Sequence, residues 1–217
     1  MNLYVYDHCP FCVRAVMAAG YKQVDVNVIA LLNDDEATCH NLIGKKMVPI
    51  LERDGHAMGE SLDIAYKLDE IGSSERVFRP ATGLKDEAAK VMGEVRQSVW
   101  NLLFPRNIQA IDCDFGTQGA KDYFRGNKEK MIDQSFEDAL AQTDEHKAKV
   151  EAALAALPTL PLPSQHEKTL GWDDVFIFPD LRNLTLVKGI KMPAEVRAYV
   201  DEVSKLSGVH TYDNIAC

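Results

Sequence analysis

Short apolar runs alternate with helical patterns at the start of the chain. Residues 3–6 (Leu-Tyr-Val-Tyr) are aromatic and β-branched, which is typical of a buried strand. Pro10 then suits the first turn of a helix, whose apolar side chains recur on one face and which we expect to end at Gly20. Residues 24–29 alternate apolar and polar positions, which predicts a half-buried second strand.

The same alternation of strand and helix continues to residue 72. The expected elements are a short helix that starts at 33–36 and ends near Gly44, a strand from Pro49, a turn at 54–55, a strand at 57–58 and a helix capped by Ser61. The order is therefore β-α-β-α-β-β-α. Parallel strands joined by helices, followed by a hairpin, predict a mixed sheet with helices on both faces, that is, an α/β domain over residues 1–72.

Beyond residue 72 the pattern changes to a helical period almost throughout. Residues 73–84 are rich in Gly, Ser and Pro and predict a linker, after which residues 85–217 predict an all-helical domain. The expected helices are a stripe at 88–103 closed by Pro105, a second stripe at 136–157 stopped by Pro158, a buried helix at 175–187 and a last helix opened by Pro193.

Composition and charge exclude several classes of function. The chain has 217 residues, 46% of them hydrophobic, and a formal charge of -9, so it lacks the basic surface that nucleic acid binding requires. No apolar run approaches the length of a membrane span, and the apolar stretch at the N-terminus is too short for a signal peptide. We therefore expect a cytoplasmic protein with neither nucleic acid nor membrane as partner.

Two of the five cysteines form the one motif that carries chemistry. Cys9 and Cys12 follow the first strand and open the first helix, which places the Cys9 sulfur against free backbone N–H groups at the positive end of the helix. Such a position lowers the pKa of a thiol from about 8.5 towards roughly 3.5–7.5. Cys12 lies one turn further, within reach of a disulfide. We expect an exposed Cys9 that attacks and a covered Cys12 that resolves.

The alternatives are a zinc half-site or two inert thiols. A tetrahedral zinc site needs four ligands, yet no second Cys-x-x-Cys is present and His8, His40 and His56 show no paired spacing, so we expect no metal. The other cysteines, Cys39, Cys113 and Cys217, are isolated and are expected to be core or surface thiols. Since adjacent residues of an extended segment point apart, we expect a solvated His8 imidazole.

The segment Cys-Pro-Phe-Cys, so early in the chain, resembles the active site of the glutaredoxins. A helical domain after a thioredoxin-like one resembles the architecture of the glutathione transferases, and the combination is similar to the large bacterial glutaredoxins. The blocks that carry this resemblance are residues 6–10, 31–35, 48–51 and 181–187. One position departs from the transferase pattern, because Gly171 stands where many of those folds have a capping Ser or Thr, which leaves Asp173 or Asp174 to cap the buried helix alone.

The resemblance implies glutathione as co-substrate and names its binding residues. They are Met47, Val48, Pro49, Glu60 and Ser61. A cis bond before Pro49 would turn the backbone of Val48 outward to pair with the tripeptide, while Ser61 would receive the α-carboxylate of the γ-glutamyl end and Glu60 would face its ammonium group.

Three further side chains have less defined roles. Lys45 and Lys46 stand where they could meet the glycine carboxylate of the tripeptide, although lysine pairs in loops are usually solvated. Phe11 could cover the two sulfurs or simply pack.

The resulting hypothesis is a monomeric glutathione-dependent thiol–disulfide oxidoreductase. Its partners would be glutathione and proteins that carry a glutathione mixed disulfide or a disulfide of their own. A conjugating glutathione transferase is the first alternative, although it needs a Ser or Tyr hydroxyl where this chain has Cys9. A non-enzymatic module that holds a metal or cluster through Cys9, or binds a partner through its helical domain, is the second.

Overall fold

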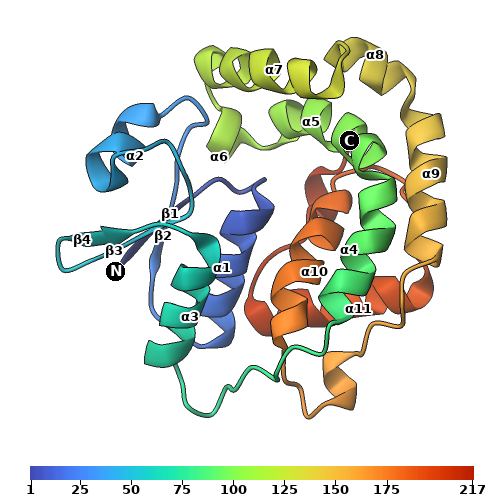
Figure 1. Ribbon diagram of the computed structural model, residues 1–217. Helices are drawn as coiled ribbons and strands as arrows, with labels where there is room; N and C mark the ends of the chain where they lie inside the picture. Colours follow the sequence, from blue (N-terminus) through green and yellow to red (C-terminus); the bar gives the residue numbers. More distant parts are fainter.

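Four short strands form one mixed sheet at the start of the chain. A computed structural model describes all 217 residues. The strands are β1 (Asn2–Val5), β2 (Asn27–Ala30), β3 (Ile50–Arg53) and β4 (His56–Met58). They are ordered β2-β1-β3-β4, with β1 parallel to β2 and antiparallel to β3, and β3 antiparallel to β4 (Figure 1).

Three helices complete this half, in the predicted order. They are α1 (Pro10–Tyr21), α2 (Glu36–Ile43) and α3 (Ser61–Ile71). Figure 1 shows α1 and α3 side by side, with α2 across the strands from them. Helices on both faces of a mixed sheet confirm the predicted thioredoxin-like fold. As predicted, α2 begins on acidic residues, since Asp35 accepts from the N–H of Thr38, and it ends at the left-handed Gly44.

Three details of this half differ from the prediction. The second strand starts at Asn27 rather than at residue 24. Gly20 lies inside α1, where a Cβ would overlap the backbone carbonyl of Ser207. Its lack of a side chain therefore lets α1 approach a helix of the second half. Ser61 is not the cap of α3, because the cap position is Glu60 and neither side chain caps the helix.

The second half is entirely helical. Its helices are α4 (Leu84–Glu94), α5 (Arg96–Ala110), α6 (Asp112–Phe115), α7 (Gln118–Ile132), α8 (Phe136–Ala141), α9 (Thr143–Ala155), α10 (Trp172–Leu184) and α11 (Ala194–Ser207), with 3₁₀ turns η1 (Pro163–Gln165) and η2 (Asp213–Ile215). The fold class, a thioredoxin-like half followed by a helical half, is thus as predicted.

The predicted helix boundaries in this half are partly wrong. The stripe at 88–103 is divided between α4 and α5 by a break at Val95, and Pro105 lies inside α5 instead of closing it. The stripe at 136–157 is likewise divided between α8 and α9, at Gln142. Two consecutive helices that pack against the same core can continue one apolar pattern although the chain changes direction between them. The helical period of the apolar residues therefore does not locate the break.

The buried helix α10 joins the two halves. It packs against α1, α4 and α11. As predicted, an aspartate caps it without a hydroxyl partner, since Asp174 accepts from the N–H of Gly171 at 2.6 Å. Asp174 also accepts from the hydroxyl of Tyr199 at 2.7 Å, which ties α10 to α11. Asp173 accepts from the N–H of Thr82 at 2.7 Å, which ties the start of α10 to the segment before α4.

A single large hydrophobic cluster extends through both halves, from Leu3 in β1 to Tyr212 after α11. This shared core fixes α1, which carries Cys12 and begins directly after Cys9, between the sheet and the helical half. No helix has both the length and the apolar composition needed to cross a membrane.

Candidate active site

Cys9 and Cys12 lie where the sequence places them, at the start of α1. Cys9 is the N-cap residue with extended backbone angles, and Pro10 is the first residue of the helix. Cys9 is half-buried, whereas Cys12 is buried with only 1% of its surface exposed. The N–H of Tyr6 donates to the Cys12 sulfur at 3.3 Å, which anchors the second thiol to the end of β1. Cys12 is covered as expected, whereas Cys9, which was expected to be exposed, is only half-exposed.

The two thiols have opposite pKa shifts. The pKa of Cys9 falls to about 6, chiefly because the Cys12 thiol donates a hydrogen bond to it, with help from the charge on His8 and the N–H groups of Cys12 and Phe11, against the effect of burial. Burial and the neighbouring Cys9 raise the pKa of Cys12. At pH 7 Cys9 is therefore mainly a thiolate. Cys12 remains protonated.

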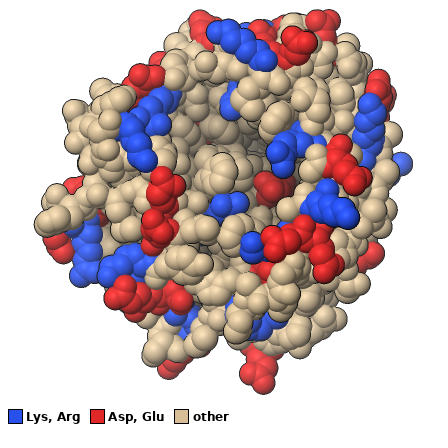
Figure 2. Space-filling view, viewed as in Figure 1, with Lys and Arg blue, Asp and Glu red and all other residues tan.

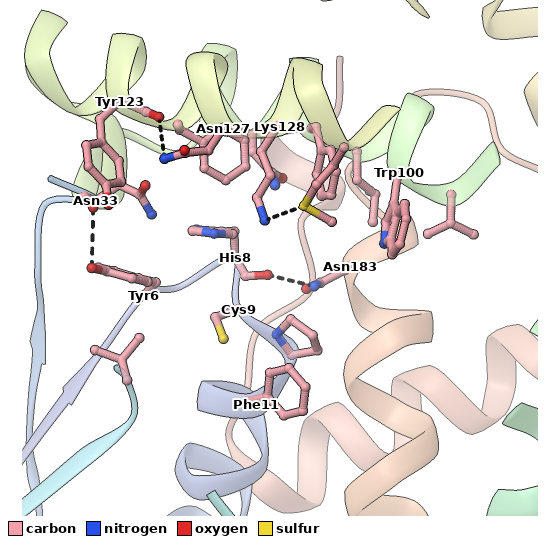
Figure 3. Close-up of a pocket in the computed structure, with 18 of the residues that line it drawn as sticks. Tyr6, His8, Cys9, Phe11, Asn33, Trp100, Tyr123, Asn127, Lys128 and Asn183 are labelled. Atoms are coloured by element: carbon pink, nitrogen blue, oxygen red, sulfur yellow. Dashed lines mark hydrogen bonds between the residues drawn. The ribbon is translucent and has the colours of Figure 1, made fainter. Parts of the chain in front are cut away.

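His8 is not solvated, so that prediction is wrong. Its Nδ1 lies 2.7 Å from Oδ2 of Asp114, whose side chain is fully buried. Its ring stacks on Tyr6 with centroids 5.7 Å apart and contacts Phe115 and Phe124 at 5.0 and 5.2 Å. Figure 3 shows the imidazole directed towards Tyr6, above the Cys9 sulfur. Asp114 comes 106 residues later in the chain, which is why no local pattern indicates the pair.

A cavity of about 520 Å³ opens beside Cys9, between the two halves. Figure 2 shows this hollow at the centre of the molecule, and Figure 3 shows its lining. The thioredoxin-like half contributes Tyr6, His8, Cys9, Phe11, Lys46 and Val48 to it, and the helical half contributes Trp100, Phe104, Tyr123, Phe124, Asn127, Lys128 and Asp180.

Sequence reasoning did not identify the wall from the helical half. Most of these side chains belong to α5 and α7, and no helix was predicted for residues 118–132. The only signal in that segment is the spacing of Ala120, Phe124 and Ile132, the three buried residues of α7.

The residues predicted to bind glutathione do not all lie in this cavity. Val48 lines it, and the Val48-Pro49 peptide bond is cis. Met47 is half-buried, with its side chain against Gly59, and Pro49 is buried. Glu60 and Ser61 stand at the start of α3, outside the cavity wall.

Two unpaired backbone regions lie among these residues. Val48 precedes β3, and neither its N–H nor its carbonyl forms a backbone hydrogen bond. The N–H groups of Ser61 and of the next two residues are likewise unpaired, as at any helix start without a capping side chain. Glu60 has a positive φ of 67°, a conformation that non-glycine residues rarely adopt and that often marks a functional site.

The lysines of this loop make different contacts. Lys46 lines the cavity, donates to the carbonyl of Asn33 at 2.7 Å and lies 3.5 Å from the ring centroid of Tyr123. Lys45 is exposed and pairs with Glu60 at 3.3 Å.

Phe11 is 52% exposed. The guanidinium of Arg14 lies 4.7 Å from the centre of the Phe11 ring.

The remaining cysteines take no part in this arrangement. Cys39 is buried, and Cys113 and Cys217 are exposed. Burial and the adjacent Asp114 raise the pKa of Cys113 to about 12. No group of three or more His, Cys, Asp or Glu side chains is placed to hold a metal ion.

Comparison with known proteins identifies the family. Residues 87–216 match the family model described as glutaredoxin 2, C terminal domain, and residues 3–76 match that of the glutathione S-transferase N-terminal domain. Glutaredoxin 2 of Escherichia coli K12 is 36% identical over 219 residues, which covers all of both chains.

Solved structures agree with this comparison. Glutaredoxin 2 of Salmonella typhimurium, in complex with glutathione, has a TM-score of 0.87 and 38% identity and covers 100% of this chain and 98% of its own. A glutathione S-transferase of Ceriporiopsis subvermispora, with a TM-score of 0.67, 12% identity and 97% of each chain covered, shares the fold alone. The helical half matches the family model, and the 36% identity to the curated relative extends over the full length of both chains. The chain therefore belongs to the glutaredoxin 2 family.

Proposed function

We propose that the protein is a glutathione-dependent thiol–disulfide oxidoreductase that uses Cys9 as nucleophile and Cys12 as resolving thiol. One observation carries the proposal: a half-buried thiol with its pKa lowered to about 6 adjoins a buried thiol with a raised pKa, on the wall of an open cavity. The first thiol is a nucleophile at neutral pH, and the second stays protonated until it is needed. Membership of the glutaredoxin 2 family supports the same chemistry.

The first reaction removes glutathione from a protein. The thiolate of Cys9 attacks the glutathione sulfur of a protein–glutathione mixed disulfide, a new disulfide forms between Cys9 and glutathione, and the protein leaves as a thiolate that takes a proton from solvent. The thiolate of a second glutathione then attacks the glutathione sulfur on Cys9. Oxidised glutathione leaves and the Cys9 thiolate is restored. Cys12 is not required.

The second reaction reduces a disulfide within a protein. Cys9 attacks one sulfur and forms a mixed disulfide with the substrate protein. Cys12 then loses its proton and attacks Cys9, which releases the reduced protein and leaves a Cys9–Cys12 disulfide. Two molecules of glutathione reduce this disulfide and leave as oxidised glutathione. Potentials of about -200 to -230 mV, typical of glutaredoxins, lie close to that of the glutathione pool.

The free backbone groups fit glutathione as the co-substrate. The unpaired N–H and carbonyl of Val48, held beside Met47 and Pro49, suit strand-like pairing with the cysteinyl part of the tripeptide. The unpaired N–H groups at the start of α3, with the Ser61 hydroxyl, suit its α-carboxylate, and Glu60 suits its ammonium group. The Salmonella relative solved in complex with glutathione supports this assignment.

Protein substrates would approach from the open side of the cavity, where Phe11 is exposed. The cytoplasm suits this chemistry, because glutathione is kept reduced there. We further propose that the protein acts there as a monomer, since one chain supplies both thiols and both walls of the cavity. Sedimentation at working concentration should give the mass of one chain, and a stable dimer would contradict this part of the proposal.

Single cysteine substitutions test the assignment. Cys12→Ser should keep the release of glutathione from a mixed disulfide but lose the reduction of protein disulfides, and Cys9→Ser should lose both activities. Cys217→Ser, which removes an exposed thiol far along the chain, is the matched control and should keep both. Full activity of the Cys9→Ser protein in either assay would refute the proposal.

A further inference from the structure

The two residues before Cys9 are held by the helical half. The N–H groups of Asp7 and His8 each donate to the carboxylate of Asp114 at 2.9 Å, and the ring of His8 meets the same carboxylate at 2.7 Å. Asp114 belongs to α6, in the helical half. A single carboxylate thus engages three groups of the segment that joins β1 to α1.

The carbonyl groups of the same two residues are also bonded to the helical half. Asp7 accepts from the guanidinium of Arg182 at 2.8 Å and from the hydroxyl of Tyr212 at 2.9 Å. His8 accepts from the side-chain amide of Asn183 at 2.8 Å, a bond drawn in Figure 3. Every backbone polar group of Asp7 and His8 is therefore paired with the helical half.

The carboxylate of Asp114 has little other function in the structure. Its side chain is fully buried, and burying a charge is costly unless hydrogen bonds compensate it. Apart from Asp7 and His8, its only hydrogen-bond partner is the weakly donating thiol of Cys113 at 3.7 Å. Its burial is thus compensated almost entirely by the segment that leads into the nucleophile.

We propose that Asp114 is a positioning residue for the reaction: it fixes the Asp7–His8 segment so that the sulfur of Cys9 keeps its alignment at the start of α1. The helical half then takes part in the chemistry through the geometry of the thiol, in addition to forming a wall of the cavity. The inference rests on the proposed role of Cys9 as nucleophile.

The physical link runs through the residue that follows. Cys9 comes directly after His8. Its thiolate is stabilised chiefly by the Cys12 thiol, and further by the charge of His8 and by the N–H groups of Cys12 and Phe11. These contributions depend on distance and direction. If the segment moves, the sulfur loses alignment with them and the pKa of Cys9 rises.

Other titratable groups lie around Cys9 and His8, and they are unchanged when Asp114 alone is substituted. They are Cys12 and Arg14 on α1, Lys46 before β3, Lys128 on α7, and Asp180 and Arg182 on α10. Arg14 and Lys128 interact with the charge of Cys9, so the pH profile in the wild type reflects them too. A difference between variants isolates the change at residue 114.

The direction of the shift separates positioning from simple charge. In Asp114→Asn one carboxylate oxygen becomes an NH₂ group. Because the N–H groups of Asp7 and His8 use different oxygens, one of them then faces a donor and loses its acceptor. Removing the negative charge of Asp114 would by its direct effect lower the pKa of Cys9, because the thiolate would have one anion fewer nearby. Loss of the held segment raises that pKa, because the His8 ring is released from Asp114 and the sulfur loses its alignment. We expect the inflexion in the pH profile of Cys9 alkylation to rise by about one pH unit, with about fivefold less thiolate at pH 6.

Two control variants complete the experiment. Asp112→Asn removes the same charge from an exposed position on the same short helix and should leave the inflexion within a few tenths of a unit of the wild type. Val200→Ala removes fully buried volume in α11 and should lower the melting temperature without moving the inflexion. Val200→Ala therefore shows how a loss of stability by itself affects the inflexion of Cys9 alkylation.

The outcome for Asp114→Asn decides whether Asp114 is a positioning residue. An unchanged or lowered inflexion in Asp114→Asn, or an equal rise in Val200→Ala, would overturn the inference. Failure of the proposed function is distinguishable, because the wild type itself would then show no thiol at residue 9 with an inflexion near pH 6.

Discussion

The proposed chemistry depends on a difference in pKa between two neighbouring thiols, Cys9 and Cys12. Cys9 gains a hydrogen bond from Cys12, while Cys12 is buried and must share its surroundings with the charge on Cys9. The pair therefore holds one negative charge, and that charge resides on the accessible sulfur. The same hydrogen bond lowers the pKa of Cys9, the proposed nucleophile, and keeps Cys12, the proposed resolving thiol, protonated.

This inequality can be tested by changing the donor. Cys12→Ala removes the largest contribution to the lowered pKa of Cys9, so the inflexion of Cys9 alkylation should rise from about 6 by at least one pH unit. Cys12→Ser retains a hydroxyl donor and should shift it less. The measurement is the alkylation rate from pH 4 to 9 followed by mass spectrometry. Profiles of both variants that match the wild type would show that the Cys12 side chain does not set the pKa of Cys9.

At this scale the sequence predicts the residues whose roles depend on near neighbours. The position of Cys9 and the burial of Cys12 follow from a strand, a proline and a helix within a dozen residues. His8 does not, because its environment is made by Asp114, Phe115 and Phe124 from the other half. The sequence around His8 therefore predicts a solvated imidazole, because it contains none of the partners that bury the ring.

The helices and strands follow the apolar pattern closely in type and less closely in extent. Proline was expected to end a helix at residue 105, but α5 continues to Ala110, with Pro105 among its buried residues. Helix α7 was missed because its surface is mostly polar and only three of its residues are buried. In both cases tertiary packing outweighs the local signal.

Gly20 makes a prediction at the level of helix packing. A methyl group there would overlap the carbonyl of Ser207, so Gly20→Ala should force α1 and α11 apart and destabilise the protein by about 1–3 kcal/mol. Gly126→Ala is the matched control, since Gly126 lies inside α7 with nothing near its Cβ position. That change should stabilise by up to about 1 kcal/mol. Urea unfolding measures both, and a stable Gly20→Ala protein would show that α1 need not approach α11 closely.

The whole molecule forms its cavity from two halves that share one core. The thioredoxin-like half carries both thiols, and the helical half supplies most of the aromatic side chains that face them. The apolar pattern shows which side chains turn inward but not which partner they meet. The two-part fold could therefore be predicted from the sequence, whereas the cavity and the Asp114–His8 contact could not.

Binding of glutathione should stabilise the whole fold. A ligand that binds only the folded state at a hundred times its Kd adds about 2.7 kcal/mol, which raises the melting temperature. In a Cys9→Ser background, which prevents disulfide formation at that position, the combined change Glu60→Gln and Ser61→Ala should remove most of this increase. Glu75→Gln, an exposed residue after α3, is the control and should keep it. An increase that survives the double change would place glutathione elsewhere.

The most direct test of the account is to find where glutathione goes. Reduced Cys12→Ser protein is mixed at pH 7 with a glutathionylated peptide, in the absence of free glutathione, and the products are mapped by mass spectrometry. The account predicts glutathione on Cys9 and a free peptide thiol. The peptide attached to Cys9, glutathione on Cys39, Cys113 or Cys217, or no transfer at all would contradict it.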